Sequence, residues 1–466
     1  MMSYDIEQRR EFSSFRDPSG YVFVEDKALY RCINSSYFPQ YRAFMNGLYD
    51  ELIKFNAIIP HQELQATESQ ILIQPEEIPY ISYPYDWSFG ELKDAAILTL
   101  KIHRRAMRHN LILKDASAYN IQFRNGQPLL IDTLSFDLYH EGEPWGAYGQ
   151  FCRHFLAPLL LMCERDIRLN RLLALFIDGI PLDLAKTLLN GKGGFFARQH
   201  IIWHSNSIVK HESDGRKLFG RWKILDGIQI SRERHLALIE SLIRGIEALK
   251  LKNVATEWSD YYAHTNYTPE ANGDKNKIVR KFLNVLKPQT TWDLGANDGT
   301  FSRLALECGS KVVAFDIDPL AVERNYQSVK RTHENMLPLV LDLTNPSPGI
   351  GFANHERKTI SERQKPDCVM ALAVIHHLAI SNNLPLEMLA KWLASLCKSL
   401  IIEFVPKEDS QVQLLLATRR DIFPNYNQEA FETIFTKYFR LKAKENIADS
   451  KRIIYCFDEK EEENNS

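Results

Sequence analysis

The run Thr291-Trp292-Asp293-Leu294-Gly295-Ala296-Asn297-Asp298-Gly299-Thr300-Phe301 decides the fold of the C-terminal half. It reads as a strand, a turn of small residues and the start of a helix. Gly295 and Gly299 let the backbone approach a ligand closely, and Asn297 is among the residues that tolerate a positive φ. Asp293 places a carboxylate at the strand end, where it can bind a ligand amine or order the turn. The run predicts a ligand-binding turn, although a tight strand–helix connection fits a lone glycine turn equally well.

Strands and helices alternate on both sides of this run. This alternation predicts an α/β fold, a doubly wound and mainly parallel sheet whose ligand lies at the carboxyl ends of the strands. The predicted strands are 289–294, 311–315, 338–341, 368–372 and 399–404, and the predicted helices are 278–286, 300–308, 320–331 and 386–397.

Two further strands end in carboxylates. Asp316 follows a buried strand about 20 residues after Asp293, which suits a hydrogen bond to ribose hydroxyls. Asp316 could instead cap the next helix, but Asp318 before Pro319 fits that role better. Asp342 follows the third strand and suits the exocyclic amine of a purine. Three acidic strand ends disfavour a diphosphate and favour a cationic nucleoside without phosphate.

These motifs resemble class I S-adenosylmethionine-dependent methyltransferases over roughly residues 255–458. Asn297 is a departure, because a glycine is common at that position of the family's first motif. The resemblance implies a Rossmann-like seven-stranded sheet, with an antiparallel last strand near residues 449–455, and S-adenosyl-L-methionine as cofactor. It also implies a set of cofactor-binding residues: Asp293, Gly295, Asn297, Gly299, Asp316, Asp342 and Ala371.

The segment 367–378 resembles the family's fourth strand and active-site loop. It lacks the Asn/Asp-Pro-Pro-Tyr run of many methylases that act on adenine or glutamine, which disfavours that chemistry. His376 and His377 follow, and a neutral imidazole can take a proton as a methyl group moves. They are the candidate catalytic residues, although each could instead make a structural contact. Glu403 could face the substrate or hold a nearby amide.

The segments 401–413 and 421–426 resemble a narrower group, the nodulation-associated bacterial methyltransferases. The stretches 258–262 and 266–267 also fit that group. Their tyrosines could cover the cofactor or pack over the edge of the sheet.

The N-terminal half contains a second pattern. Asp115 and Asn120 have the spacing of a kinase catalytic loop, and Asp132 follows a predicted hairpin at Asn125-Gly126 where a kinase places its metal-binding aspartate. Residues 18–165 therefore resemble a degenerate protein-kinase-like α+β fold. The half lacks a Gly-rich loop, a Val-Ala-Ile-Lys strand and an Ala-Pro-Glu motif. A kinase-like fold without phosphotransfer, an active phosphotransferase and coincidence within an unrelated fold all stay open.

The chain of 466 residues predicts two domains, 1–250, helical from about residue 140, and 251–466, which ends in a disordered acidic tail from about 459. The net charge is −2, and basic and acidic residues balance in each half, which disfavours nucleic acid as a partner. Seven scattered cysteines predict a reduced, cytoplasmic protein without a metal site. The charged N-terminus excludes a signal peptide, and no apolar run is long enough to span a membrane.

Together these observations predict a methyltransferase that acts on a small molecule, and the nodulation resemblance suggests a carbohydrate or cell-surface precursor. Two alternatives remain. The first half could transfer phosphate in a bifunctional enzyme, or it could be a scaffold that recruits protein or RNA to the methylase.

Overall fold

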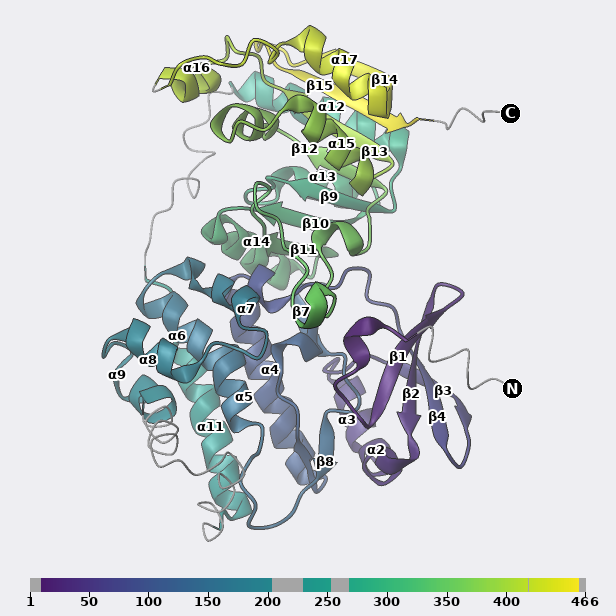
Figure 1. Cartoon of the computed structure of the whole chain (residues 1–466), viewed down its shortest axis with the longest axis vertical. Helices are drawn as coiled ribbons and strands as arrows, with labels where there is room; N and C mark the ends of the chain where they lie inside the picture. Colours follow the sequence, from purple (N-terminus) through teal and green to yellow (C-terminus); the bar gives the residue numbers. More distant parts are fainter. Residues whose placement is uncertain (1–9, 203–228, 253–267, 418, 461–466) are drawn as a thin grey trace. The chain divides into compact units, whose positions relative to one another are not determined.

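The computed structural model describes residues 10–202, 229–252, 268–417 and 419–460. The chain divides into two compact units (Figure 1). The first comprises Met1–Val254 with Gly349–Arg357, and the second comprises Ala255–Pro348 with Lys358–Ser466.

The second unit is built on a seven-stranded sheet (Figure 1). Its spatial order is β11-β10-β9-β12-β13-β15-β14. The first five strands are mutually parallel, whereas β15 runs antiparallel to both β13 and β14. The bounds are β9 Thr290–Leu294, β10 Lys311–Asp316, β11 Met336–Val340, β12 Cys368–Ala371, β13 Ser399–Phe404, β14 Phe439–Asn446 and β15 Ile453–Glu459.

Helices cover both faces of this sheet, as the α/β prediction requires. Their bounds are α12 Pro269–Leu286, α13 Thr300–Glu307, α14 Pro319–Thr332, α15 Leu386–Leu396, α16 Ser410–Ala417 and α17 Gln428–Tyr438. Side chains alternate along each strand, so Cys368 and Met370 join a core cluster with α12, α13 and α14. The Phe431 ring of α17 packs at a tilt against the rings of Tyr455 and Phe404 of the sheet.

Most predicted elements of this unit are confirmed, but α12 is a correction. It begins at Pro269 rather than at residue 278, because the Thr268 side chain caps it by accepting a hydrogen bond from the Ala271 N–H. The polar residues 269–277 are therefore the first turns of a helix. Its inner face buries Ala271 and Lys275.

The first unit begins with a four-stranded antiparallel sheet in the order β1-β2-β4-β3. The strands are β1 Gly20–Glu25, β2 Ala28–Asn34, β3 His61–Ala66 and β4 Gln70–Pro75. Two helices, α2 Phe38–Met45 and α3 Leu48–Lys54, are separated at Gly47, whose φ of 97° ends the first.

A long helix, α4 Phe89–Arg108, continues the first unit and starts at a capping box of Ser88 and Glu91. The short strands β6 Ile121–Arg124 and β7 Gln127–Leu130 form the predicted hairpin. The remaining elements of this unit are β5 Leu111–Leu113, β8 Phe136–Leu138, α5 Tyr148–Phe151, α6 Ala157–Glu164, α7 Leu172–Leu175, α8 Leu182–Leu189, α9 Gly194–Ala197 and α11 Arg232–Ala248.

A short segment from the second half of the sequence belongs to the first unit. The connection from β11 to β12 contributes Gly349–Arg357 to it. The buried Glu356 carboxylate accepts two hydrogen bonds from the Arg16 guanidinium, at 2.6 and 2.9 Å. The Arg357 guanidinium lies 4.3 Å from the centre of the Tyr119 ring. The predicted domains, 1–250 and 251–466, did not include this return of the chain to the first unit.

All seven cysteines lie in the described part of the chain, and none forms a disulfide there. No helix among the described residues combines the length and apolarity needed to cross a membrane. The predicted tail lies mostly outside the described residues, because β15 runs to Glu459 and residues 461–466 are not described.

Two buried histidines meet between α4 and α11. The rings of His103 and His235 lie 5.1 Å apart, and none of their four nitrogens has a hydrogen-bond partner among the described residues. Burial lowers the pKa of His103 well below its usual value and that of His235 to about 4. Both imidazoles are therefore neutral in the folded chain near neutral pH.

We predict that acid destabilises this helix pair. In the unfolded chain both histidines have a pKa of about 6.5 and bind protons below it, whereas in the folded chain they stay neutral. The free energy of unfolding therefore decreases as the pH falls below about 6.5. His235→Leu should reduce this loss by up to about 1.4 kcal/mol per pH unit. Hydrogen exchange of α4 and α11 peptides between pH 7 and pH 5 measures it. The exposed His140→Leu is the control, and an equal slope in both variants would contradict the prediction.

Candidate active site

A cavity of about 370 Å³ opens at the carboxyl ends of the parallel strands in the second unit. Its lining comes from α12, from the segments that follow β9, β10, β11 and β12, and from α16. Six residues singled out in the sequence line this one cavity: Asp293, Gly295, Asn297, Asp316, Asp342 and His377. Gly299, Ala371 and His376 are not among the lining residues.

The turn after β9 needs its special residues. Gly295 has a φ of 76°, and a Cβ there would lie 2.3 Å from Val374 Cγ2. Asn297 has a φ of 50°, which agrees with the expectation that it tolerates this conformation. Gly299 has a φ of 82°, and a Cβ there would meet the Asn325 amide at 2.6 Å. Gly299 therefore serves helix packing rather than the cavity wall.

Two carboxylates stand at the strand ends. Asp293 is 2% exposed and accepts a hydrogen bond of 2.6 Å from Ser302 Oγ. Asp316 accepts hydrogen bonds of 2.8 Å from the N–H groups of Asn297 and Asp318. Burial raises the pKa of both aspartates to about 6. A cationic or hydroxyl-bearing ligand would favour their ionised forms.

Hydrogen bonds show which aspartate caps α14 and what Asp342 contacts. Asp318, not Asp316, caps α14, since its side chain accepts from the Leu320 N–H at 2.8 Å. Asp342 accepts from the Thr344 N–H at 2.9 Å and from its hydroxyl at 2.6 Å. Asp342 thus orders the loop after β11 while it lines the cavity.

The two candidate catalytic histidines differ in position. Their rings lie 4.1 Å apart, but only His377 lines the cavity. His376 is 2% exposed, and its Nδ1 has no hydrogen-bond partner in the described chain. Burial, with a smaller contribution from the Arg452 charge, lowers the pKa of His377, and burial beside His377 lowers the pKa of His376. A neutral His377 imidazole therefore faces the cavity near neutral pH.

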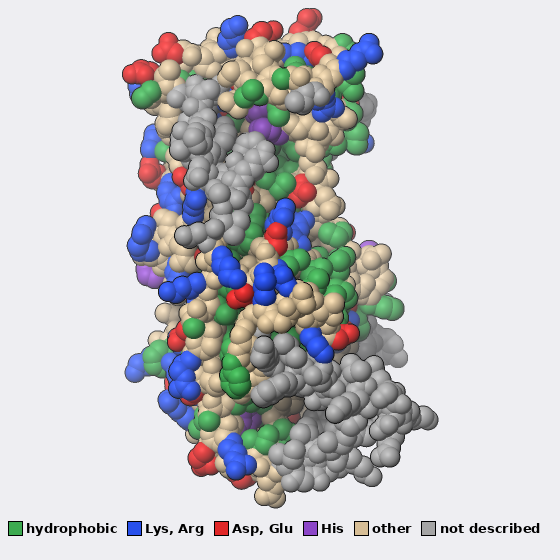
Figure 2. Space-filling view, turned by 90° about the vertical axis from the view of Figure 1, so that its left-hand side faces the viewer, with side chains coloured by type: hydrophobic (Ala, Val, Ile, Leu, Met, Phe, Trp, Pro, Cys, Tyr) green, Lys and Arg blue, Asp and Glu red, His purple; other side chains and the backbone are tan. Residues whose placement is uncertain are grey.

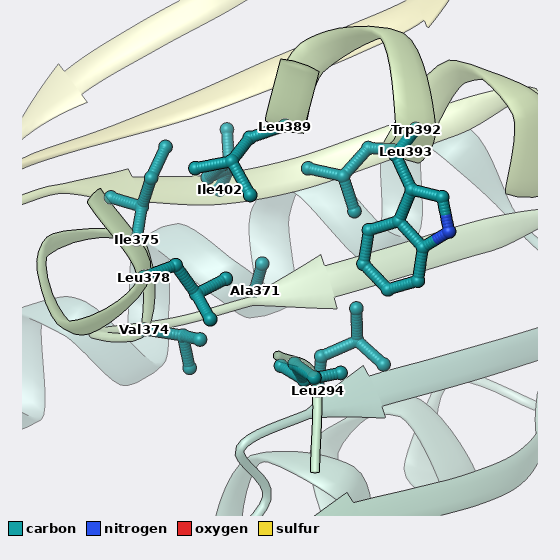
Figure 3. Close-up of a pocket in the computed structure, with 10 residues that line it drawn as sticks. Leu294, Ala371, Val374, Ile375, Leu378, Leu389, Trp392, Leu393 and Ile402 are labelled. Carbon is teal, nitrogen blue, oxygen red and sulfur yellow. The ribbon is translucent and has the colours of Figure 1, made fainter. Parts of the chain in front are cut away.

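Ala371 lies against an adjoining apolar void of about 10 Å³, the size of one water molecule (Figure 3). The side chains of Trp392, Leu389 and Leu294 surround it (Figure 3). Val374 and two leucines line both the void and the cavity. The cavity therefore has one dry, close-packed wall.

Sequence reasoning missed a chain of buried charges that reaches the cavity at Lys275. Lys275 lines the cavity, and its Nζ lies 2.6 Å from Glu403 Oε2. Arg452 lies 3.4 Å from the other Glu403 oxygen and donates two hydrogen bonds to Asp409, at 2.7 and 3.0 Å. Glu403 thus pairs with two cations rather than with an amide. The signal was a lysine at helical spacing between Ala271 and Ile278, on an otherwise apolar face.

Other lining residues were also missed, including Asn272, Ser381, Asn382 and Leu415. The stretches 258–262 and 266–267, whose tyrosines were expected near the cofactor, lie outside the described residues.

In the first unit, the three residues of the kinase-like pattern lie in one hydrogen-bonded group. Asn120 Nδ2 donates to Ser135 Oγ at 3.2 Å, and the Ser135 hydroxyl donates to Asp132. Asp132 also forms an ion pair with Arg31 of β2. Asp115 accepts a hydrogen bond of 2.7 Å from the Gln150 amide. Burial and the nearby Asp132 charge raise the pKa of Asp115.

Strand order and cavity together define the class of the second unit. Counted along the chain, its strands lie in the order 3-2-1-4-5-7-6, in which a reversed strand is inserted next to the last parallel one. A glycine turn and strand-end carboxylates border the cavity. This is the fold of class I S-adenosylmethionine-dependent methyltransferases.

The chain belongs to the family of the nodulation protein NoeA. The NoeA protein of Rhizobium meliloti (strain 1021) is 37% identical over 463 residues, which cover 97% of this chain and 96% of that protein. No protein-family model matches the chain.

Several solved structures align with less than half of the chain. One is the N-methyltransferase NodS from Bradyrhizobium japonicum WM9, 12% identical, which covers 41% of this chain and 98% of its own at a TM-score of 0.31. Another is the magnesium protoporphyrin IX methyltransferase ChlM from Synechocystis PCC 6803 with bound S-adenosylhomocysteine (SAH), 18% identical, with coverages of 43% and 92% and a TM-score of 0.30. The strand order of the sheet, not these partial alignments, identifies the fold.

We predict that SAH binding weakens below pH 6. Asp293 and Asp316, whose pKa values are raised to about 6, lose on protonation the negative charge that attracts the cationic amino group of the ligand and strengthens its hydrogen bonds. The Kd should rise by up to about tenfold per pH unit below 6 if one proton is taken up. Calorimetry from pH 5 to pH 8 measures it. His377→Ala should keep this pH dependence, and a flat profile would contradict the assignment to the aspartates.

Proposed function

We propose that this protein is a methyltransferase that uses S-adenosyl-L-methionine and methylates a small-molecule acceptor. The observation that supports it most is the convergence of Asp293, Gly295, Asp316 and Asp342 on one cavity of a methyltransferase fold. The residues present fit the cofactor. A side chain at Gly295 would fill the turn, and the two carboxylates with raised pKa values favour a cationic partner.

The roles proposed for the chain follow from this geometry. Asp293 holds the amino-acid end of the cofactor, Asp316 the ribose and Asp342 the adenine amine. The cofactor supplies a methyl group on a positively charged sulfur. The chain aligns the acceptor in a partly apolar cavity that excludes water, which accounts for much of the rate in such transfers.

His377 is the proposed base. Its neutral imidazole nitrogen takes the proton that the acceptor's hydroxyl or amine loses as the methyl group arrives. Lys275 also lines the cavity, and its ammonium is paired with the buried Glu403 carboxylate. His376, which does not line the cavity, supports the His377 ring and takes no proton from the acceptor.

We favour a small acceptor in the cytoplasm over nucleic acid. Positive and negative side chains are interspersed over the described atoms in Figure 2, as expected from the net charge of −2. Nucleic-acid enzymes generally gather basic residues into a patch. Within the small molecules, we propose a carbohydrate or other cell-surface precursor as the acceptor class.

Binding of SAH to the full chain tests this proposal. We expect calorimetry to show binding that Asp316→Ala weakens by roughly 10- to 100-fold, since a buried charge-assisted hydrogen bond is lost. Tritiated S-adenosylmethionine incubated with the low-molecular-weight fraction of cell extract should label an acceptor, and His377→Ala should slow labelling but spare SAH binding. If the wild-type protein does not bind SAH, the proposal is wrong.

For the first unit we propose a kinase-like fold that recognises the acceptor and does not transfer phosphate. The arrangement of Asp115, Asn120 and Asp132 supports the fold. The ion pair of Asp132 with Arg31 argues against catalysis, because this carboxylate would have to bind a metal–nucleotide. A scaffold that recruits protein or RNA is the alternative, and strongly salt-dependent RNA binding would favour it.

We predict that the full chain binds ATP-Mg no more tightly than its Asp132→Ala variant. Titration calorimetry of both proteins measures this, and Arg31→Met is the informative third variant because it releases the carboxylate. Tight ATP-Mg binding that Asp132→Ala abolishes would instead establish the bifunctional alternative.

A further inference from the structure

A helix of unusual geometry carries part of the cavity wall. The π-helix η13, His377–Ser381, follows β12, and both of its end residues line the cavity. The Asn382 N–H and side-chain amide both donate to the His377 carbonyl, at 3.2 and 3.0 Å. Such wide helical turns are rare and often occur at functional sites.

One side chain from a distant part of the sequence supports the end of this helix. Arg419 Nη1 donates to the carbonyls of Ile380 and Ser381, at 2.5 and 3.3 Å, and Nη2 donates to Asn383 Oδ1 at 2.5 Å. The guanidinium also lies 5.1 Å from the centre of the Phe423 ring. The last carbonyls of a helix have no partner within it, so this half-buried guanidinium replaces the missing donors.

The segment that contains Arg419 lines the same cavity. Residues of α16 precede it, and Leu415 of that helix is a lining residue. Further support comes from Lys407, whose Nζ donates to both oxygens of the Asp421 carboxylate at 2.9 and 2.8 Å. Arg419 therefore joins two segments that are distant in the sequence, η13 and the segment that begins with α16, and both contribute residues to the cavity lining.

We infer that Arg419 is a positioning residue for methyl transfer, which holds η13 in the conformation that presents His377 and Ser381 to the acceptor. This inference rests on the proposed function. A guanidinium fork reaches two carbonyls and an amide oxygen at once, which a lysine ammonium cannot do in the same geometry.

The inference separates acceptor chemistry from cofactor binding. Arg419 contacts none of the proposed cofactor residues, which follow β9, β10 and β11. Its loss would release the end of η13 and displace His377, whereas the turn braced by Asp316 would stay in place. Displacement of a catalytic group by about 1 Å can lower a rate by roughly 100-fold.

The test compares Arg419→Met with Arg420→Met in the full chain. Arg420 is the matched control, because it is the adjacent, exposed arginine. We expect Arg419→Met to lower kcat/KM for labelling the low-molecular-weight extract fraction by roughly 10- to 100-fold, with SAH affinity changed less than about threefold. Arg420→Met should change neither. Guanidinium chloride at low concentration should partly restore labelling in Arg419→Ala.

The outcomes are distinguishable. If the wild type neither binds SAH nor labels an acceptor, the proposed function fails. If the wild type does both and Arg419→Met behaves like Arg420→Met, the positioning role is wrong. If Arg419→Met loses SAH affinity in proportion to labelling, Arg419 supports the whole unit and the inference is overturned. If Arg419→Met fails to fold, the guanidinium rescue of Arg419→Ala is the test instead. The absence of rescue would then overturn the inference.

Discussion

The carboxylate of Asp316 is the constraint on which the site depends. It accepts one backbone N–H from the turn after β9 and another from the turn after β10, so a single buried group fixes two neighbouring strand ends. If these two turns moved independently, the cavity-lining residues that they carry would not keep fixed positions relative to one another. The group is also the one expected to face the ribose. Structural order and ligand recognition therefore draw on one side chain, whose two oxygens already hold backbone donors before a ligand arrives.

Burial explains why this arrangement suits a cationic ligand. Burial makes the ionised form of both carboxylates costly and raises their pKa values to about 6. A bound positive charge relieves this cost, whereas a phosphate would add to it. Lys275, which lines the same cavity, is paired with Glu403, and Arg452 behind it is paired with Glu403 and Asp409, so these buried cations are compensated within the chain.

The sequence predicted much of the second unit because its signals are local. Thr291–Phe301 combines a buried strand with a turn whose glycines and Asn297 adopt positive φ, and this pattern determines both the fold and the cradle. Lys275 was missed because its role depends on Glu403, which lies far along the sequence. Arg419 was missed for the same reason, since its partners are main-chain oxygens that no residue type reveals. Long-range pairing of this kind leaves no periodic trace in a sequence.

The return of Gly349–Arg357 to the first unit has a consequence for how this protein can be taken apart. The segment supplies the carboxylate that binds Arg16 and the guanidinium that covers Tyr119. A fragment that stops at Val254 would remove the carboxylate hydrogen-bonded to Arg16 and uncover the Tyr119 ring, which lies between Asp115 and Asn120 in the sequence. The two halves are thus distinct in architecture but not separable by one cut. Dissection of this protein must therefore proceed by substitution within the intact polypeptide.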